Sequence, residues 1–126
     1  CRKERGAEAD VIQIITADLA DKESVRELGT KAIAIAGDHI DVLINCGGIS
    51  SRSDFIDTRI EIDELVMQIN FFAGASLAKS VVPGMIDSEG QSRIIWISSV
   101  QGLMGITSRT SCMLQNRCSH ASNYFV

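Results

Sequence analysis

The chain has 126 residues, enough for one domain, and 45% of them are hydrophobic, so the composition supports a buried core. Only 5% are aromatic, which predicts a core built mainly from aliphatic side chains. The formal net charge is −4 and the Lys and Arg residues are scattered, which argues against a nucleic-acid partner, since such a partner requires a basic face.

The four cysteines, at positions 1, 46, 112 and 118, show no paired C-x-x-C spacing, and no secretory segment precedes them. We therefore interpret them as reduced thiols of an intracellular protein, either cytoplasmic or held at the endoplasmic reticulum by an N-terminal segment that this sequence lacks. A closed zinc site needs four ligands, which Cys112, Cys118 and His120 do not supply, so no metal is predicted. No apolar run approaches the ~20 residues that span a bilayer, so we expect no membrane segment in this chain.

The first predicted element is a short buried strand over residues 11–16, because VIQIIT is rich in β-branched apolar residues. The residues after it change to helical spacing, with apolar positions at Val25, Leu28, Ala32, Ile35 and Ala36. Asp21 supplies the chemistry of an N-cap for this helix, and Gly37 supplies its C-terminal end.

A second buried strand is predicted over residues 40–45, and it leads directly into a Cys-Gly-Gly turn. A long helix is then predicted over residues 59–85, and Pro83 and Gly84 indicate that it ends there. A third strand is predicted over residues 93–98, and it ends in two serines.

Strands that alternate with helices in this order predict an α/β fold with a parallel sheet. Each predicted strand is apolar on both faces, so we expect helices on both sides of the sheet. In open sheets of this kind, ligands bind outside the carboxyl ends of the strands. Polar residues and glycines follow all three predicted strands, at residues 16–18, 45–48 and 98–99. The sequence therefore predicts a binding crevice at that edge of the sheet.

Four segments in register resemble the classical short-chain dehydrogenase/reductase (SDR) family, over about residues 6–107. TADLAD resembles the family's Asp-Val/Leu after its third strand, and DVLINCGGIS its Asn-Asn-Ala-Gly turn after the fourth. IIWISSVQG resembles the fifth-strand motif with its catalytic serine, and MQINFFAG the long helix with its Asn. The resemblance implies a partial Rossmann-type, doubly wound parallel sheet over residues 1–110, containing strands three to five of the family fold.

The resemblance also implies an oxidoreductase that transfers a hydride between NAD or NADP and a small-molecule carbonyl or secondary alcohol. By resemblance, the implied cofactor-binding residues are Asp18 and Leu19 beside the adenine ring, and the turn of Asn45, Cys46, Gly47 and Gly48. Ser99 would orient the substrate and stabilise charge on its oxygen. Asn70 would hold a water molecule in a proton relay.

The residue types alone leave plainer alternatives open at these positions. Asp18 also suits a helix cap, and the turn suits the backbone freedom of glycine. Ser99 also suits the end of a strand, and Asn70 a side chain bonded to local backbone. The turn departs from the family pattern because Cys46 replaces an Asn, and a thiol lacks the amide's two donors.

Two further parts of the family pattern are not found in this sequence. The family's Tyr, thirteen residues after the serine, and its Lys, four residues beyond, fall at Cys112 and Asn116. Neither replaces a proton donor assisted by a charged neighbour. The family's N-terminal Gly-rich turn is also missing, so the choice between NAD and NADP cannot be read. We therefore expect a catalytically impaired chain; the alternative is a non-catalytic fragment or pseudoenzyme that acts through dimerisation of the Asn70 helix.

The end of the chain, residues 111–126, is polar and lacks an apolar stripe, so we expect an irregular tail, for which a reading-frame or splice change near Ser111 is one explanation. Within the family's sheet order 3-2-1-4-5, the first predicted strand would lie roughly 14 Å from the second. It would have no hydrogen-bonding neighbour, and unpaired buried backbone is costly. We therefore expect the chain alone to be unstable or molten, or this strand to repack.

Overall fold

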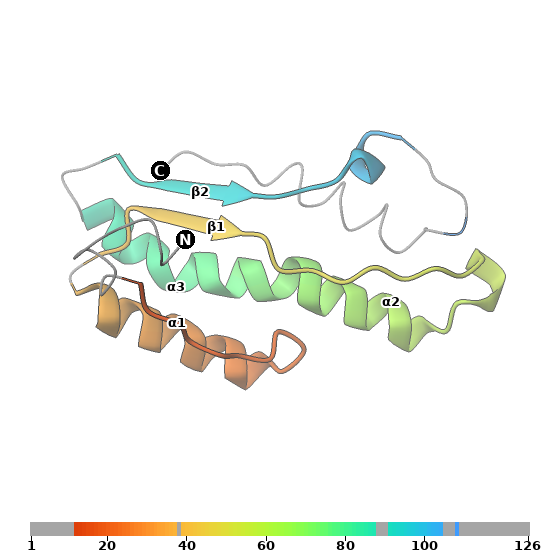
Figure 1. Ribbon diagram of the computed structural model, residues 1–126, viewed down its shortest axis with the longest axis horizontal. Helices are drawn as coiled ribbons and strands as arrows, with labels where there is room; N and C mark the ends of the chain where they lie inside the picture. Colours follow the sequence, from red (N-terminus) through yellow and green to blue (C-terminus); the bar gives the residue numbers. More distant parts are fainter. Residues whose placement is uncertain (1–11, 38, 88–90, 105–107, 109–126) are drawn as a thin grey trace.

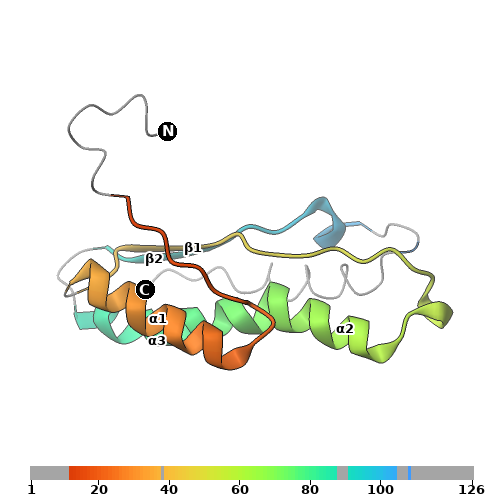
Figure 2. The same cartoon turned by 60° about the horizontal axis from the view of Figure 1, so that its bottom comes forward.

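The computed structural model describes residues 12–37, 39–87, 91–104 and 108. Two strands lie over a layer of helices, all on one side of the strands (Figure 1 and Figure 2). The strands are β1 (Val42–Asn45) and β2 (Arg93–Trp96), and the helices are α1 (Lys22–Ala36), α2 (Ile60–Met67) and α3 (Ala73–Asp87). Short 3-10 turns lie at Phe55–Asp57 and Val100–Gly102.

The two strands are parallel, with Val42 opposite Arg93 and Asn45 opposite Trp96. This confirms the predicted α/β class with a parallel sheet, although both strands are two residues shorter than predicted. Because the strands run in the same direction, the segments that follow Asn45 and Trp96 leave the sheet at the same edge (Figure 1). That edge is where ligands bind in folds of this class.

The predicted strand over residues 11–16 is wrong for the part that the structure describes. Residues 12–18 form no strand, and Ile14 is 88% exposed. A strand requires a neighbour to pair its N–H and C=O groups, and the described sheet consists of β1 and β2 alone. The segment instead crosses the molecule as irregular chain and leads into the turn before α1 (Figure 2).

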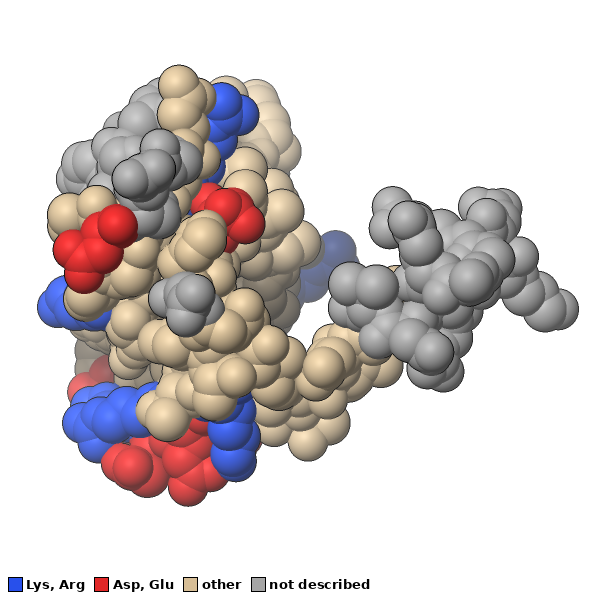
Figure 3. All heavy atoms as spheres, turned by 90° about the vertical axis from the view of Figure 1, so that its left-hand side faces the viewer, with Lys and Arg blue, Asp and Glu red and all other residues tan. Residues whose placement is uncertain are grey.

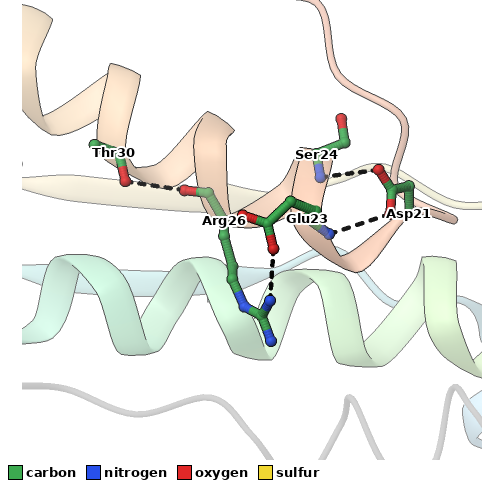
Figure 4. A network of polar contacts seen from close by, with 5 residues as sticks. All are labelled: Asp21, Glu23, Ser24, Arg26 and Thr30. Carbon is green, nitrogen blue, oxygen red and sulfur yellow. Dashed lines mark hydrogen bonds and ion pairs between the residues drawn. The ribbon is translucent and has the colours of Figure 1, made fainter.

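Helix α1 begins and ends where its capping residues predict. The Asp21 carboxylate accepts hydrogen bonds from the backbone N–H groups of Glu23 (3.2 Å) and Ser24 (3.1 Å) (Figure 4). Gly37 ends the helix with φ = +88° and donates its N–H to the carbonyl of Ile33. On the exposed side of the helix, Arg26 and Glu23 form an ion pair of 2.7 Å. Figure 3 shows basic and acidic side chains lying side by side on this end of the molecule.

The predicted long helix is continuous over Ile60–Asp87, but a π-helical turn, Gln68–Phe72, interrupts its α-helical geometry. We call this segment the π turn. Pro83 does not end the helix, which continues to Asp87, two residues beyond its predicted end. Proline removes one backbone donor near the end of the helix, and Met85 (2% exposed) packs in the core and holds the last turn in place.

The core lies between α3 and the inner face of the sheet. It contains Val81 and Met85 of α3, and Ile94 and Trp96 of β2, all at most 8% exposed. The expectation of helices on both sides of the sheet is wrong for the described residues. The outer face of the strands is open, and large side chains there are exposed: Val42 45%, Ile44 57% and Ile97 57%.

The helix over Ile60–Asp87 is long and apolar enough to cross a membrane, by length and composition alone. Core helices of soluble domains meet the same criterion, but they are mostly buried, whereas only 22% of the apolar stretch of this helix is buried, although α3 packs beside α1 and under the strands (Figure 2). The absence of a membrane segment therefore stays a prediction.

Candidate functional site

A cavity of about 520 Å³ lies where the segments after β1 and β2 leave the sheet, which is a volume typical of small-molecule sites. The predicted site residues that line it are Leu19, Asn45, Cys46, Gly47, Gly48, Asn70 and Ser99. Asp18, the remaining predicted site residue, is exposed and does not line the cavity. Residues that are far apart in the sequence therefore line the same cavity, at the predicted edge of the sheet.

Asn70 fastens the turn after β1. Its side-chain oxygen Oδ1 accepts from the N–H of Ile49 at 2.8 Å, and its Nδ2 donates to the carbonyl of Ile49 at 2.8 Å. These partners of the side chain are thus backbone groups, as the plainer alternative requires, although they belong to a residue 21 positions away in the sequence. A Cβ atom on Gly48 would lie 3.3 Å from Oδ1 of Asn70, and glycine therefore permits the close approach.

A second polar residue of the π turn, Gln68, was not identified from the sequence. Its Nε2 donates to the carbonyl of Leu19 at 3.3 Å. Leu19 also contacts the turn, because a Cβ atom on Gly47 would lie only 2.7 Å from its Cδ1. The available signal was a polar side chain two residues before Asn70, with the apolar residues Val66, Met67 and Ile69 beside it.

Asp18 organises its own turn. Its Oδ1 accepts from the N–H of Ala20 at 2.9 Å, and its N–H donates to Oγ of Ser24 at 2.9 Å. The cap of α1 belongs to Asp21, so Asp18 is not the capping residue that the alternative required. Asp18 precedes the cavity residue Leu19 in the sequence, but it does not itself line the cavity.

Ser99 lies three residues beyond the end of β2, so it does not close the strand as the alternative required. Its Oγ accepts from the N–H of Gln101 at 3.4 Å and caps the 3-10 turn that follows. Accepting this bond uses a lone pair and leaves the hydroxyl proton available for donation into the cavity.

The floor of the cavity is closely packed. Asn45 and Trp96 are opposite each other in the sheet, and Gly74 of α3 lies against both. Nδ2 of Asn45 is buried and has no hydrogen-bond partner among the described residues. An unpaired buried donor costs about 1–3 kcal/mol, so an acceptor on a bound molecule would be favourable there.

Cys46 is a free, exposed thiol in the cavity wall. The positions of the missing Tyr-Lys pair, Cys112 and Asn116, lie outside the described residues, as does the whole segment 111–126.

A parallel α/β unit with a ligand-sized cavity at the carboxyl ends of its strands is typical of Rossmann-like proteins. The family model described as short chain dehydrogenase matches residues 1–111. The chain therefore belongs to the short-chain dehydrogenase/reductase family.

Two relatives illustrate how far the similarity extends. Dehydrogenase/reductase SDR family protein 7-like of Drosophila melanogaster is 38% identical over 98 residues, covering 78% of this chain and 29% of that protein. Dehydrogenase/reductase SDR family member 7B of Mus musculus is 34% identical over 108 residues, covering 86% of this chain and 33% of that protein. The chain thus spans about a third of the length of these curated relatives.

Solved structures show the same fold. The chain resembles 4-hydroxyisoleucine dehydrogenase complexed with NADH with a TM-score of 0.78 at 23% identity, covering 86% of this chain and 48% of that one. It resembles 7α-hydroxysteroid dehydrogenase complexed with NADH and 7-oxo glycochenodeoxycholic acid with a TM-score of 0.75 at 22% identity, covering 83% of this chain and 40% of that one. The predicted Rossmann-type fold is therefore confirmed.

Proposed function

We propose that this chain is part of an oxidoreductase that transfers a hydride between NAD or NADP and a small-molecule carbonyl or secondary alcohol, with catalysis impaired in these 126 residues alone. The observation that carries the proposal is the shared cavity, which Leu19, the turn after β1, Asn70 and Ser99 line together at the carboxyl ends of two parallel strands. Family membership and the NADH complexes of two structural neighbours support it.

The residues that are present fit a dinucleotide. Gly47 and Gly48 leave backbone exposed in the cavity wall, and the buried Nδ2 of Asn45 offers an unused donor. Leu19 supplies an apolar wall, and the exposed carboxylate of Asp18 beside it suits an adenine amino group at the rim. The bound nicotinamide would supply or accept the hydride.

The chain's own residues would position the substrate. Ser99 would donate its hydroxyl proton in a hydrogen bond to the substrate oxygen and stabilise charge that develops there. Asn70 would hold the turn in place through Ile49 and, as in the family, a water molecule of the proton relay. Proton transfer would be weak because Cys112 stands where the family has Tyr, and this supports impaired catalysis.

A non-catalytic role is the second candidate, in which the fragment acts by pairing through the Asn70 helix. Exposed apolar side chains on that helix favour it: Ile60 is 64% exposed, Leu65 38% and Phe72 52%. In this case the tail 111–126 would be a divergent addition to a partial dinucleotide-binding domain, 1–110. An intracellular location, cytoplasmic or at the endoplasmic reticulum, stays a prediction.

Titration of the chain into NADH and NADPH, followed by nicotinamide fluorescence, separates the two candidates. Measurements at roughly 10–20 °C use the temperature range in which proteins are most stable. We expect saturable binding of one nucleotide, and protection of Cys46 from alkylation as mapped by mass spectrometry. Ser99→Ala should bind equally well, because its hydroxyl serves the substrate. Absence of both binding and protection, together with self-association in sedimentation equilibrium, would replace the first candidate by the second.

A further inference from the structure

Gln68 links the π turn to the segment that precedes α1. Its half-buried side chain donates to the carbonyl of Leu19, 49 positions earlier in the sequence. The residue lies next to the cavity wall and contacts no reacting group, so any effect on chemistry must pass through Leu19 and its neighbour Asp18.

The π turn holds two walls of the cavity at once. Gln68 binds Leu19, and Asn70 binds both backbone groups of Ile49. Residues two apart on a helix point to different sides, so a single turn reaches two separate loops. The Leu19 side chain completes the arrangement, because it lies against Gly47 of the second loop.

This contact ties the segment before α1 directly to the π turn, whereas the segment's other support comes from its own turn, from α1 and from Leu19 against Gly47. Residues 12–18 belong to no strand, and Ile12 and Ile14 are exposed. The bonds between Asp18, Ala20 and Ser24 fix the shape of the local turn, but they do not tie it to the helix on which the cavity is built. Within the described part of the chain, the Gln68 bond is the polar contact that does so.

We propose that Gln68 is a positioning residue of the cofactor site, which sets the Asp18–Leu19 segment at the distance from Gly47 that a dinucleotide requires. This inference rests on the proposed function. Loss of the donor would let the segment move away from the cavity and would weaken nucleotide binding, while the β1–β2 side of the cavity would remain as it is.

Three substitutions test the donor. Gln68→Met removes it without adding charge, Gln68→Glu replaces it by an acceptor of the same shape, and Gln68→Lys retains an N–H donor. All four side chains are good helix formers, so the helix itself is little affected. Gln91→Met is the matched control, because Gln91 lies two residues before β2, where it contacts Arg93 and does not line the cavity.

Two readouts are compared for each variant: the Kd for NADH and NADPH, and hydrogen–deuterium exchange of residues 17–21 in the absence of nucleotide. We expect Gln68→Met and Gln68→Glu to raise Kd about three- to tenfold, the value of one hydrogen bond, and to speed exchange over 17–21. Gln68→Lys should restore slow exchange, and Gln91→Met should change neither readout.

Unchanged exchange in Gln68→Met would overturn the inference, and so would faster exchange with the wild-type Kd. Faster exchange throughout β2 as well would show a general loss of structure and would also count against a positioning role. If the wild-type chain binds neither nucleotide, the proposed function fails together with the inference, whereas equal Kd values for wild type and variants overturn the inference alone.

Discussion

Gly74→Ala tests the close packing of α3 against the end of the sheet. Gly74 is buried, and a Cβ atom built there lies 2.7 Å from Cη2 of Trp96 and 3.0 Å from Cγ of Asn45. Contacts this short require a displacement. The indole ring is rigid and only 8% exposed, so either the ring or the helix must move.

The size of the effect follows from two opposing terms. Overpacking of a core costs about 1–3 kcal/mol, while Gly→Ala inside a helix stabilises by about 1 kcal/mol. Because the obstacle is a rigid ring, the overpacking term lies in the upper part of its range, and we expect the free energy of unfolding to fall by roughly 1–2 kcal/mol. Gly29→Ala is the matched control, since its new Cβ lies 2.9 Å from Oγ and 3.1 Å from Cβ of Ser80. Oγ must rotate out of its bond to the Ser76 carbonyl, and we expect this moderate cost and the helix gain of about 1 kcal/mol to offset each other.

Urea unfolding followed by tryptophan fluorescence measures both variants, because Trp96 is the only tryptophan of the chain. Gly74→Ala should lower the unfolding midpoint and alter the emission of the folded state, and Gly29→Ala should do neither. A midpoint for Gly74→Ala equal to or above that of the wild type would refute the packing argument.

Three further predictions concern the turn after β1, the first helix and the chain as a whole. Asn70→Ala removes two 2.8 Å bonds to Ile49, which is 41% exposed and can bind water instead, so we expect a loss of about 1–2 kcal/mol and faster hydrogen exchange over residues 46–50; unchanged exchange there would contradict it. Asp21→Ala removes the N-cap of α1 and should cost about 1 kcal/mol in urea unfolding, whereas Asp21→Asn should retain most of that stability. The open outer face, with Val42 and Ile44 exposed, predicts binding of an apolar dye to the folded wild-type chain, and absence of dye binding would show this to be wrong.

The parts of the fold that short-range patterns determine were predictable. Asp21 and Gly37 set the limits of α1, because caps act on adjacent backbone. The apolar runs around Leu43 and Ile95 predicted the strands, and the polar residues after them predicted the edge at which the cavity lies. The shared cavity followed because parallel strands bring their carboxyl ends together.

What depends on neighbouring chain was not predictable from local patterns. Residues 12–16 have the composition of a strand, but no described strand pairs with them; the sheet order of the family, rather than any local pattern, indicated that this neighbour would be missing. The π turn was missed because an apolar spacing does not distinguish α-helical from π-helical geometry over five residues. Gln68 was missed because its contact is to Leu19, 49 positions earlier in the sequence, and only the folded structure brings the two residues together.

The two-stranded sheet has a consequence for the behaviour of the chain in solution. In the described part of the molecule each strand pairs on one side alone, so β1 and β2 both present an unpaired row of N–H and C=O groups. Such a row templates the addition of another strand, and the exposed valine and isoleucine side chains of β1 make that addition favourable. Fibril formation or capture by chaperones would then compete with folding. Because strand addition joins two chains, the fraction of chains lost to fibrils would increase with protein concentration.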